Sequence, residues 1–360
     1  MKVAINASFL NRPDTGSGQY LTHLAAELRQ PEYGIELQLV QPPSDGNFTK
    51  LIFEQITFPR AASAGRADLA HVPYWGSALF PRVPTVVTIH DLIPLRLPAY
   101  RGSPNVRAYM RLVAQAAARA RMVITDSEAS QRDIVRLLGL PERKVRVVYL
   151  AADERFRPVT DDAVLETVRQ KYRLPDAFAL YLGGFDQRKN VLNVVRAFAL
   201  VAKGLGPDYS LVLAGRLPER KASSDLFPDV RPLINELGLT EYVHLIGEIP
   251  EADKAALYTL AHCFVWPSIY EGFGLPVLEA MACGTPVVTS NGGSLAEIVG
   301  DAGFAVDPDD VRQLAGAIIP SLIDAGLRQS HREKGLARAA DFTWAKCARE
   351  TVEVYREAVR

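Results

Sequence analysis

Two carboxylates eight positions apart mark the segment of this chain with the clearest chemical pattern. Glu271 opens the run EGFGLPVLEAMACG, and Glu279 lies inside it. Gly272 and Gly274 permit close approach of the backbone, and Pro276 suits a first helical turn. The free N–H groups and positive dipole end of that helix would attract a diphosphate. Glu271 could then face a sugar while Glu279 reaches a ribose, although a glycine loop with one capping and one solvated carboxylate would give the same pattern.

A second segment places two adjacent cations after an apolar run. In GGFDQRKN, Gly184 precedes Arg188 and Lys189, and an apolar helical pattern follows. Two cations at a glycine-rich turn between strand and helix suit a diphosphate leaving group, because they can neutralise its developing charge. Such chemistry requires no metal ion. For a pattern this short, a polar capping turn with solvated side chains is the alternative.

The N-terminal half contributes a glycine pattern before its first helical segment. The run DTGSGQY extends from Asp14 to Tyr20 and carries Gly16 and Gly18. A dinucleotide fingerprint would need a glycine where Leu21 stands, which counts against a dehydrogenase. An ordinary turn between strand and helix remains open for these glycines.

His90 and Asp91 follow the apolar run TVVTI. Side chains at the carboxyl end of a parallel strand face the ligand crevice. His90 is therefore a candidate site residue, with a satisfied structural histidine as the alternative. Asp91 is a candidate base for an acceptor, or it orients the local backbone.

The elements that must position these residues repeat in two series of short apolar runs, as expected for strands buried on both faces of parallel sheets. The first series is VAIN, LQLV, LAHV, TVVTIH, MVIT and VRVVYL, and the second is FALYLGG, SLVLAG, VHLIG, CFVWPS, PVVTS and FAVDP. Helical segments separate the runs, so the fold class is α/β with two Rossmann-like domains. We place the domains at 1–155 and 156–342, and we expect a helix over 343–360, capped by Thr343, to cross back to the N-terminal domain.

The motifs GGFDQRKN, VHLIGEIPEADKAALY and PSIYEGFGLPVLEAMACGTPVVTSNGGSLAEIVGDAG resemble the retaining GT-B glycosyltransferases of glycosyltransferase family 4. The likeness covers nearly the whole C-terminal half and is highly specific. It implies two domains whose parallel sheets face across a cleft and a retaining sugar transfer there. It also implies that Glu271 lies against the donor sugar and that Arg188 and Lys189 bind the diphosphate. The donor-binding positions that it implies in this half are Gly184, Gly247, Ile249, Gly272, Phe273, Gly274, Leu275 and Glu279.

The N-terminal half resembles the family more loosely. The resemblance places Gly16 and Gly18 near the donor phosphates and His90 near the donor sugar. The run HDLIPL is similar to bacterial mannosyltransferase-like members, so GDP-mannose is the first donor to expect, with UDP-glucose or another UDP-sugar as the alternative. The acceptor would be a glycan or lipid-linked glycan. An epimerase and a non-catalytic nucleotide-sugar-binding subunit stay open as functions of other classes.

Composition limits the remaining possibilities. Lys+Arg and Asp+Glu both total 41, which argues against a nucleic-acid partner held by phosphate neutralisation. The three cysteines form no metal-ligand or disulfide pattern, so we expect no structural metal and a cytoplasmic location. The resemblance implies a nucleotide-sugar co-substrate, and with Arg188 and Lys189 beside its diphosphate we expect no metal or other cofactor. Five arginines between Tyr100 and Arg121 follow a helical pattern that suits a solvated face or, alternatively, a peripheral contact with the inner face of a membrane.

Overall fold

The computed structural model describes residues 1–12, 15–44, 46–218 and 224–360, so Asp14 lies outside the described residues. The chain divides into two compact units. The N-terminal unit contains Met1–Leu150 and Phe342–Arg360, and the C-terminal unit contains Ala151–Asp341. The division therefore falls after Leu150 rather than after residue 155.

The N-terminal unit is built on a parallel six-stranded sheet with the order β2-β1-β3-β4-β5-β6. Its strands are β1 (Lys2–Asn6), β2 (Glu36–Val40), β3 (Leu69–Val72), β4 (Thr85–Thr88), β5 (Met122–Thr125) and β6 (Val145–Val147). Each strand coincides with one of the apolar runs of the first series. β4 ends at Thr88, so His90 lies two residues past the strand and not at its last position.

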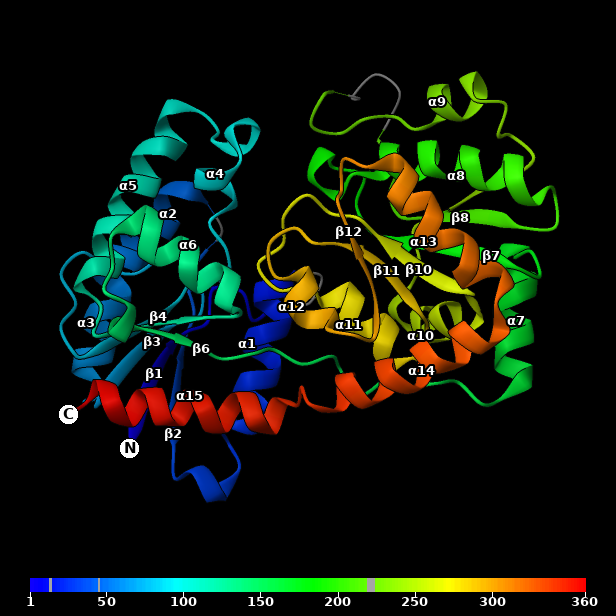
Figure 1. The fold of residues 1–360 in the computed structure, drawn as a ribbon. Helices are drawn as coiled ribbons and strands as arrows, with labels where there is room; N and C mark the ends of the chain where they lie inside the picture. Colours follow the sequence, from blue (N-terminus) through cyan, green and yellow to red (C-terminus); the bar gives the residue numbers. More distant parts are fainter. Residues whose placement is uncertain (13–14, 45, 219–223) are drawn as a thin grey trace. The chain divides into compact units, whose positions relative to one another are not determined.

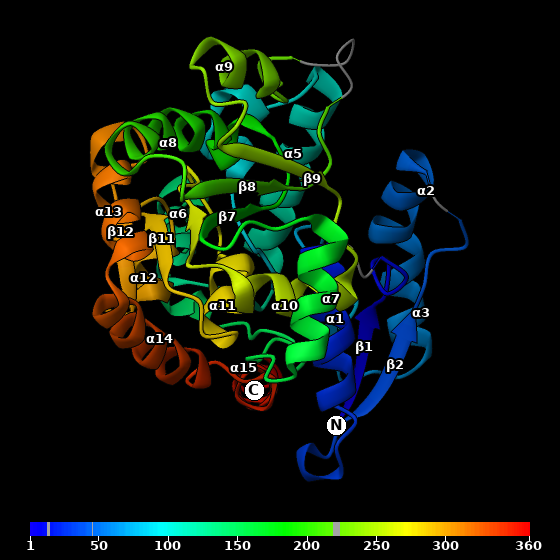
Figure 2. The same ribbon diagram turned by 90° about the vertical axis from the view of Figure 1, so that its right-hand side faces the viewer.

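Helices cover this sheet (Figures 1 and 2). They are α1 (Gly16–Glu27), α2 (Asn47–Ile52), α3 (Phe58–Ala64), α4 (Ile93–Arg96), α5 (Pro104–Arg119), α6 (Glu128–Leu138) and α15 (Trp344–Ala358). A π-helical turn, Phe53–Thr57, joins α2 to α3. The five arginines of the α5 region are exposed. This fits a solvated face, and a membrane contact there stays a prediction.

α15 belongs to the N-terminal unit and lies against α1 (Figure 1). Thr343 caps it by accepting a hydrogen bond from the Lys346 N–H at 3.1 Å, which stabilises a helix start by about 1 kcal/mol. Tyr355 of α15 is fully buried, and its hydroxyl lies 2.6 Å from Nδ1 of the buried His71 in β3. Burying the apolar face of α15 and satisfying this polar pair hold the helix on this unit.

The C-terminal unit has a second parallel six-stranded sheet with the order β12-β11-β10-β7-β8-β9. Its strands are β7 (Phe178–Leu182), β8 (Ser210–Ala214), β9 (Val243–Gly247), β10 (Cys263–Trp266), β11 (Val287–Ser290) and β12 (Gly303–Val306). The central strands are buried along their whole length, which explains their unbroken apolar sequences.

Helices lie on both faces of this second sheet (Figures 1 and 2), with α8 packed on α13 and α10 packed on α11. The helices are α7 (Asp162–Tyr172), α8 (Val191–Leu205), α9 (Arg231–Glu236), α10 (Glu251–Leu260), α11 (Leu275–Ala282), α12 (Leu295–Val299), α13 (Val311–Ile323) and α14 (Ala325–Ala340). In the part of the chain that the structure describes, no helix has the length and apolarity needed to cross a bilayer. All three cysteines are buried and free.

The strand order of the C-terminal unit reverses between β7 and β10. From β7 the chain adds β8 and β9 on one side, and it then returns to add β10, β11 and β12 on the other. The loops after β7 and β10 therefore leave the sheet side by side at its carboxyl edge. Open α/β sheets bind ligands at such a switch point.

Candidate active site

The two segments singled out by their chemistry meet at the switch point of the C-terminal unit. Arg188 and Lys189 end a short 3-10 turn, Gln187–Lys189, in the loop after β7. Glu271 lies in the loop after β10, directly before α11. The fold thus brings together residues that are more than 80 positions apart in the sequence.

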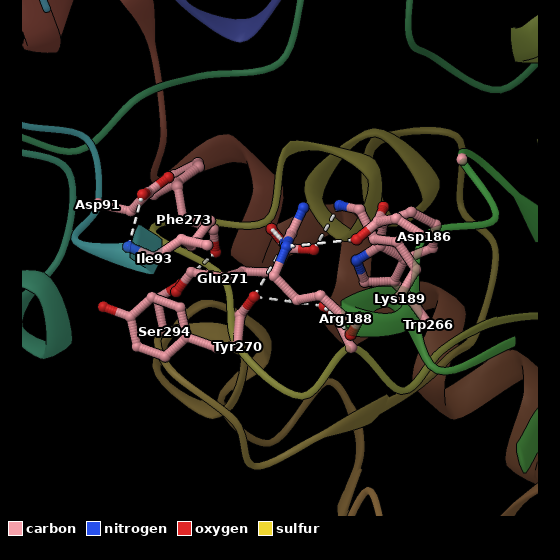
Figure 3. Close-up of polar contacts among 12 residues, drawn as sticks. Asp91, Ile93, Asp186, Arg188, Lys189, Trp266, Tyr270, Glu271, Phe273 and Ser294 are labelled. Carbon is pink, nitrogen blue, oxygen red and sulfur yellow. Dashed lines mark hydrogen bonds and ion pairs between the residues drawn. The ribbon is translucent and has the colours of Figure 1, made fainter. Parts of the chain in front are cut away.

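Glu271 is held by both cations (Figure 3). Its Oε2 accepts a hydrogen bond from Nη1 of Arg188 at 2.6 Å, and its Oε1 accepts one from Nζ of Lys189 at 2.6 Å. The three side chains are only 11–15% exposed. Arg188 also donates to the Tyr270 carbonyl at 2.9 Å, which fixes its guanidinium against the loop that carries Glu271.

This arrangement keeps Glu271 ionised. Burial opposes the charge of its carboxylate, but Lys189 and Arg188 outweigh burial and lower its pKa to about 2. Burial lowers the pKa of Lys189, and Glu271 opposes that effect. Asp186 Oδ1 also lies 3.7 Å from Nε of Arg188, so the two cations Arg188 and Lys189 are matched by two carboxylates. An incoming diphosphate would therefore compete with Glu271 for the same donors.

Trp266, which the sequence did not single out, forms a platform for Lys189. The ammonium of Lys189 lies 4.5 Å from the indole ring centroid, a cation–π distance. A Cβ on Gly183 would lie 2.4 Å from the same indole, so only glycine fits there. Two sequence features could have indicated this contact: an aromatic residue at the end of one predicted strand and a glycine directly after another.

Hydrogen bonds and close backbone packing hold the loop that carries Glu271, and the residues that make them were also missed by sequence reasoning. Ser268 Oγ donates to the Arg188 carbonyl at 3.0 Å, which joins the two loops. Ser294 Oγ donates to the Phe273 carbonyl at 2.5 Å. Gly293 has φ +61, and a Cβ there would lie 2.3 Å from the Glu271 carbonyl oxygen. The run SNGGS shows the glycines but not which backbone they approach.

The predicted donor-binding loop lies at the start of α11. Gly274 is the residue before the helix and has φ +111, a conformation that favours glycine. Gly272, Phe273 and Gly274 are buried, and Leu275 begins the helix. The first N–H groups of a helix lack intrahelical acceptors, so this end of α11 suits an anion.

Glu279 differs from Glu271 although it is also buried. It lies inside α11, and its Oε2 accepts a hydrogen bond from the Tyr258 hydroxyl at 3.0 Å. Burial raises its pKa to about 7, and Lys254 and Tyr258 oppose the rise only in part. Its carboxylate can therefore gain or lose a proton near neutral pH.

The other predicted donor-binding residues of this unit follow neighbouring strands. Gly184 is exposed in the loop after β7, and Gly247 ends β9 with φ +75. Ile249 is buried just before α10. The roles of these three residues in donor binding stay predictions.

His90 and Asp91 lie in the N-terminal unit, where Asp126 is the partner that sequence reasoning missed. His90 Nδ1 lies 2.7 Å from Asp126 Oδ2, and its Nε2 lies 3.2 Å from the Pro73 carbonyl. Burial lowers the pKa of His90, but Asp126 outweighs burial and the pKa is raised overall. Asp91 accepts from the Ile93 N–H at 3.0 Å, which matches the backbone-orienting alternative.

The glycines of the DTGSGQY run do not form a loop. α1 begins at Gly16 because Thr15 caps it, accepting from the Gly18 N–H at 3.1 Å. Gly18 is buried, and a Cβ there would lie 1.9 Å from the Arg12 carbonyl oxygen, whereas Gly16 is surrounded by open space. The backbone therefore requires Gly18 and does not require Gly16. A donor contact by either stays a prediction.

Solved structures resemble this chain over almost its whole length. Sucrose-phosphate synthase from Thermosynechococcus elongatus matches 99% of this chain and 98% of its own, with a TM-score of 0.76 and 24% identity. Anabaena HepE in complex with UDP and glucose matches 99% of both chains, with a TM-score of 0.77 and 20% identity. These likenesses establish the fold, which is the GT-B architecture of glycosyltransferases.

Sequence comparison then defines the family. Residues 16–156 match "Glycosyltransferase Family 4", and residues 166–338 match "Glycosyl transferases group 1". O-antigen chain mannosyltransferase B of Escherichia coli is 36% identical over 273 residues, covering 75% of this chain and 70% of the relative. Serotype-specific mannosyltransferase WbdA of Escherichia coli is 32% identical, and the match covers 33% of that longer protein. The chain belongs to glycosyltransferase family 4.

Proposed function

We propose that this chain is a retaining, metal-independent hexosyltransferase that uses a nucleotide-diphosphate sugar, with GDP-mannose as the first donor to test. The acceptor would be a glycan or a lipid-linked glycan. The observation that carries the proposal is the convergence of Arg188 and Lys189 on Glu271 beside the start of α11. The 36% identity to an O-antigen mannosyltransferase favours mannose. The HepE complex with UDP and glucose keeps a UDP-sugar as the alternative.

The cationic pair supplies what a diphosphate leaving group needs. In the proposed reaction the bond between the anomeric carbon and the β-phosphate oxygen breaks, and the electron pair leaves with the phosphate. Arg188, Lys189 and the N–H groups at the start of α11 would stabilise that charge with preorganised donors. Within the described residues, no three His, Cys, Asp or Glu side chains are grouped to hold a metal ion, and metal independence remains part of the proposal.

The acceptor oxygen would attack the same face of the sugar that the phosphate leaves, which keeps the anomeric configuration. Its proton would pass to the departing phosphate, so both charge and atoms balance. Retaining glycosidases set a second carboxylate about 5–5.5 Å from the first as a nucleophile. In this proposal Glu271 instead contacts the donor sugar, and Glu279 accepts hydrogen bonds from the ribose.

Thermal stabilisation by a panel of GDP-, UDP-, ADP- and dTDP-sugars, with EDTA present, tests the donor site. The wild type should be stabilised by one nucleotide class, and Lys189→Ala should lose at least about tenfold in affinity for it, as expected for a charge-assisted hydrogen bond. Lys203→Ala is the matched control, because Lys203 is exposed on α8 of the same unit. No stabilisation by any donor would contradict the donor assignment.

A transfer assay with an oligosaccharide acceptor tests the reaction. NMR of the product should show that the donor's anomeric configuration is kept. The transfer rate should be the same with and without EDTA. Inversion at the anomeric carbon would overturn the retaining mechanism. Conversion of the donor without any acceptor would instead indicate an epimerase.

A further inference from the structure

A pocket of about 280 Å³ lies at the opposite edge of the second sheet from Glu271. Its lining includes His262 and Pro286, which directly precede β10 and β11, and Gly284, which follows α11. Parallel strands place their amino ends at one edge and their carboxyl ends at the other. This amino-edge pocket is therefore separate from the candidate donor site.

Two arginines of α14, Arg328 and Arg332, enter the lining four residues apart on one helix face. Arg328 Nη1 donates to the Leu322 carbonyl at 2.7 Å, and Arg332 Nη1 lies 3.4 Å from the Gly284 carbonyl. Among the described residues, neither guanidinium has a carboxylate within 4 Å. A guanidinium has five N–H donors, so these contacts use only a part of what each side chain offers.

The other cations of α14 are paired, which makes these two unusual. Lys334 lies 3.1 Å from Asp301, and Arg338 lies 3.2 Å from Asp341. Like charges four residues apart destabilise a helix, and a cation close to a helix N-terminus opposes the helix dipole. Arg328 is the fourth residue of α14 and carries both costs. A bound anion would offset them.

The lining residues also carry no negative charge. Arg328 and Arg332 are the cations of the lining, and no carboxylate belongs to it. Burial lowers the pKa of His262, and the nearby Arg328 and Arg169 lower it further. Asp324, which directly precedes α14, accepts a hydrogen bond from the Leu327 N–H at 3.0 Å.

We propose that this pocket binds the phosphate group of a small phosphorylated sugar. Arg328 and Arg332 would hold the phosphate oxygens through charge-assisted hydrogen bonds. A volume of 280 Å³ holds more than a bare phosphate, since a water occupies about 30 Å³, and it falls just below the roughly 300–1,000 Å³ of drug-sized ligand sites. The Gly284 end of α11 lines the pocket, and the other end of α11 begins at the candidate donor site.

Calorimetric titration with inorganic phosphate and with glucose 6-phosphate tests the proposal. The Arg188→Ala/Lys189→Ala double variant is used alongside the wild type, so that the candidate donor site contributes no phosphate binding. Binding should persist in that background. Arg332→Ala and Arg328→Ala should each weaken binding by about tenfold or more. Lys334→Ala on the same helix is the matched control and should bind as the parent does.

Histidine NMR gives a second readout that does not depend on activity. A bound phosphate should raise the pKa of His262, because it replaces a positive potential with a negative charge. Arg328→Lys and Arg332→Lys keep the charge and should keep part of the binding, even if an alanine variant folds poorly.

Three results would overturn the inference. The first is no phosphate binding in the double-variant background, and the second is an affinity that neither Arg328→Ala nor Arg332→Ala changes. The third is an affinity for neutral methyl glucoside equal to that for glucose 6-phosphate. Because the donor panel does not use this pocket, failure here leaves the proposed transferase function untouched, and the converse also holds.

Discussion

Glu271, in the loop before α11, and Glu279, inside α11, are both buried, yet their environments move their pKa values in opposite directions. Glu271 has two cations at 2.6 Å, and its pKa is lowered to about 2. Glu279 has a tyrosine hydroxyl at 3.0 Å, and burial raises its pKa to about 7. Equal burial therefore does not set the charge of a carboxylate, and the nearest partners decide it.

The largest effect should come from Glu271→Gln, which removes the charge but keeps the shape. Two buried cations would lose their closest counter-charge, so the free energy of unfolding should fall by about 3 kcal/mol, and turnover should fall by about 10² or more. Affinity for the nucleoside diphosphate should not fall, because the competing carboxylate is gone. Denaturant titration, rate measurement and diphosphate titration check these outcomes, with the exposed Glu236→Gln as control.

Retained turnover in Glu271→Gln would remove Glu271 from the reaction. Retained stability would mean that the two cations find other partners.

The pH dependence of stability should separate the two carboxylates. Because the folded pKa of Glu279, about 7, exceeds its ordinary value of 4.5, its stabilising effect is complete below pH 4.5 and is lost as pH rises through 7. The loss should reach up to about 3 kcal/mol. Glu271 behaves oppositely: its contribution is present above pH 4.5 and is lost as pH falls toward 2.

Unfolding free energies of the wild type and Glu279→Gln between pH 4.5 and 8 check this expectation. The variant should lack the decline. A decline of equal size in the variant would assign it to another group. Donor affinity should rise with pH toward 7 in the wild type only, because the ionised carboxylate is the better acceptor for ribose hydroxyls.

A smaller effect is expected from Gly293→Ala, which tests whether backbone packing fixes the Glu271 loop. The added Cβ would lie 2.3 Å from the Glu271 carbonyl oxygen at a φ of +61, so stability should fall by about 2 kcal/mol, with lower turnover. Gly316→Ala is the control, since open space surrounds Gly316 within α13 of the same unit and alanine favours the helix. Equal effects of the two changes would refute the packing argument.

The smallest effect is expected in the N-terminal unit, where Asp126 is a buried carboxylate beside a histidine. Burial lowers the pKa of His90 and Asp126 raises it, so Asp126→Asn should lower the pKa of His90. Asp91→Asn should lower the pKa of His90 less, because Asp91 contributes less than Asp126 to raising that pKa. Histidine NMR titration measures both, and an unchanged His90 pKa in Asp126→Asn would contradict the pairing.

The sequence by itself determined the strands, and it singled out the residue types of the loop that carries Glu271, whose role with a donor stays a prediction. Within the described residues, apolar runs predicted each strand of the two sheets because both faces of a parallel sheet are buried. The prediction differed from the structure at strand ends, as at His90, which lies two residues past the end of β4. The glycine pattern of Gly16 and Gly18 predicts a loop or turn before the first helix, whereas Thr15 caps α1 and both glycines lie in that helix.

Tertiary structure alone decided which residues meet. Asp126 is 36 positions from His90, and Trp266, Ser268 and Gly293 join the Glu271 site only because β7, β10 and β11 lie next to one another in the sheet. The opposite pKa shifts of Glu271 and Glu279 likewise follow from partners brought in by the fold. A sequence displays residue types and their local spacing, whereas burial and electrostatics depend on distances that only packing creates.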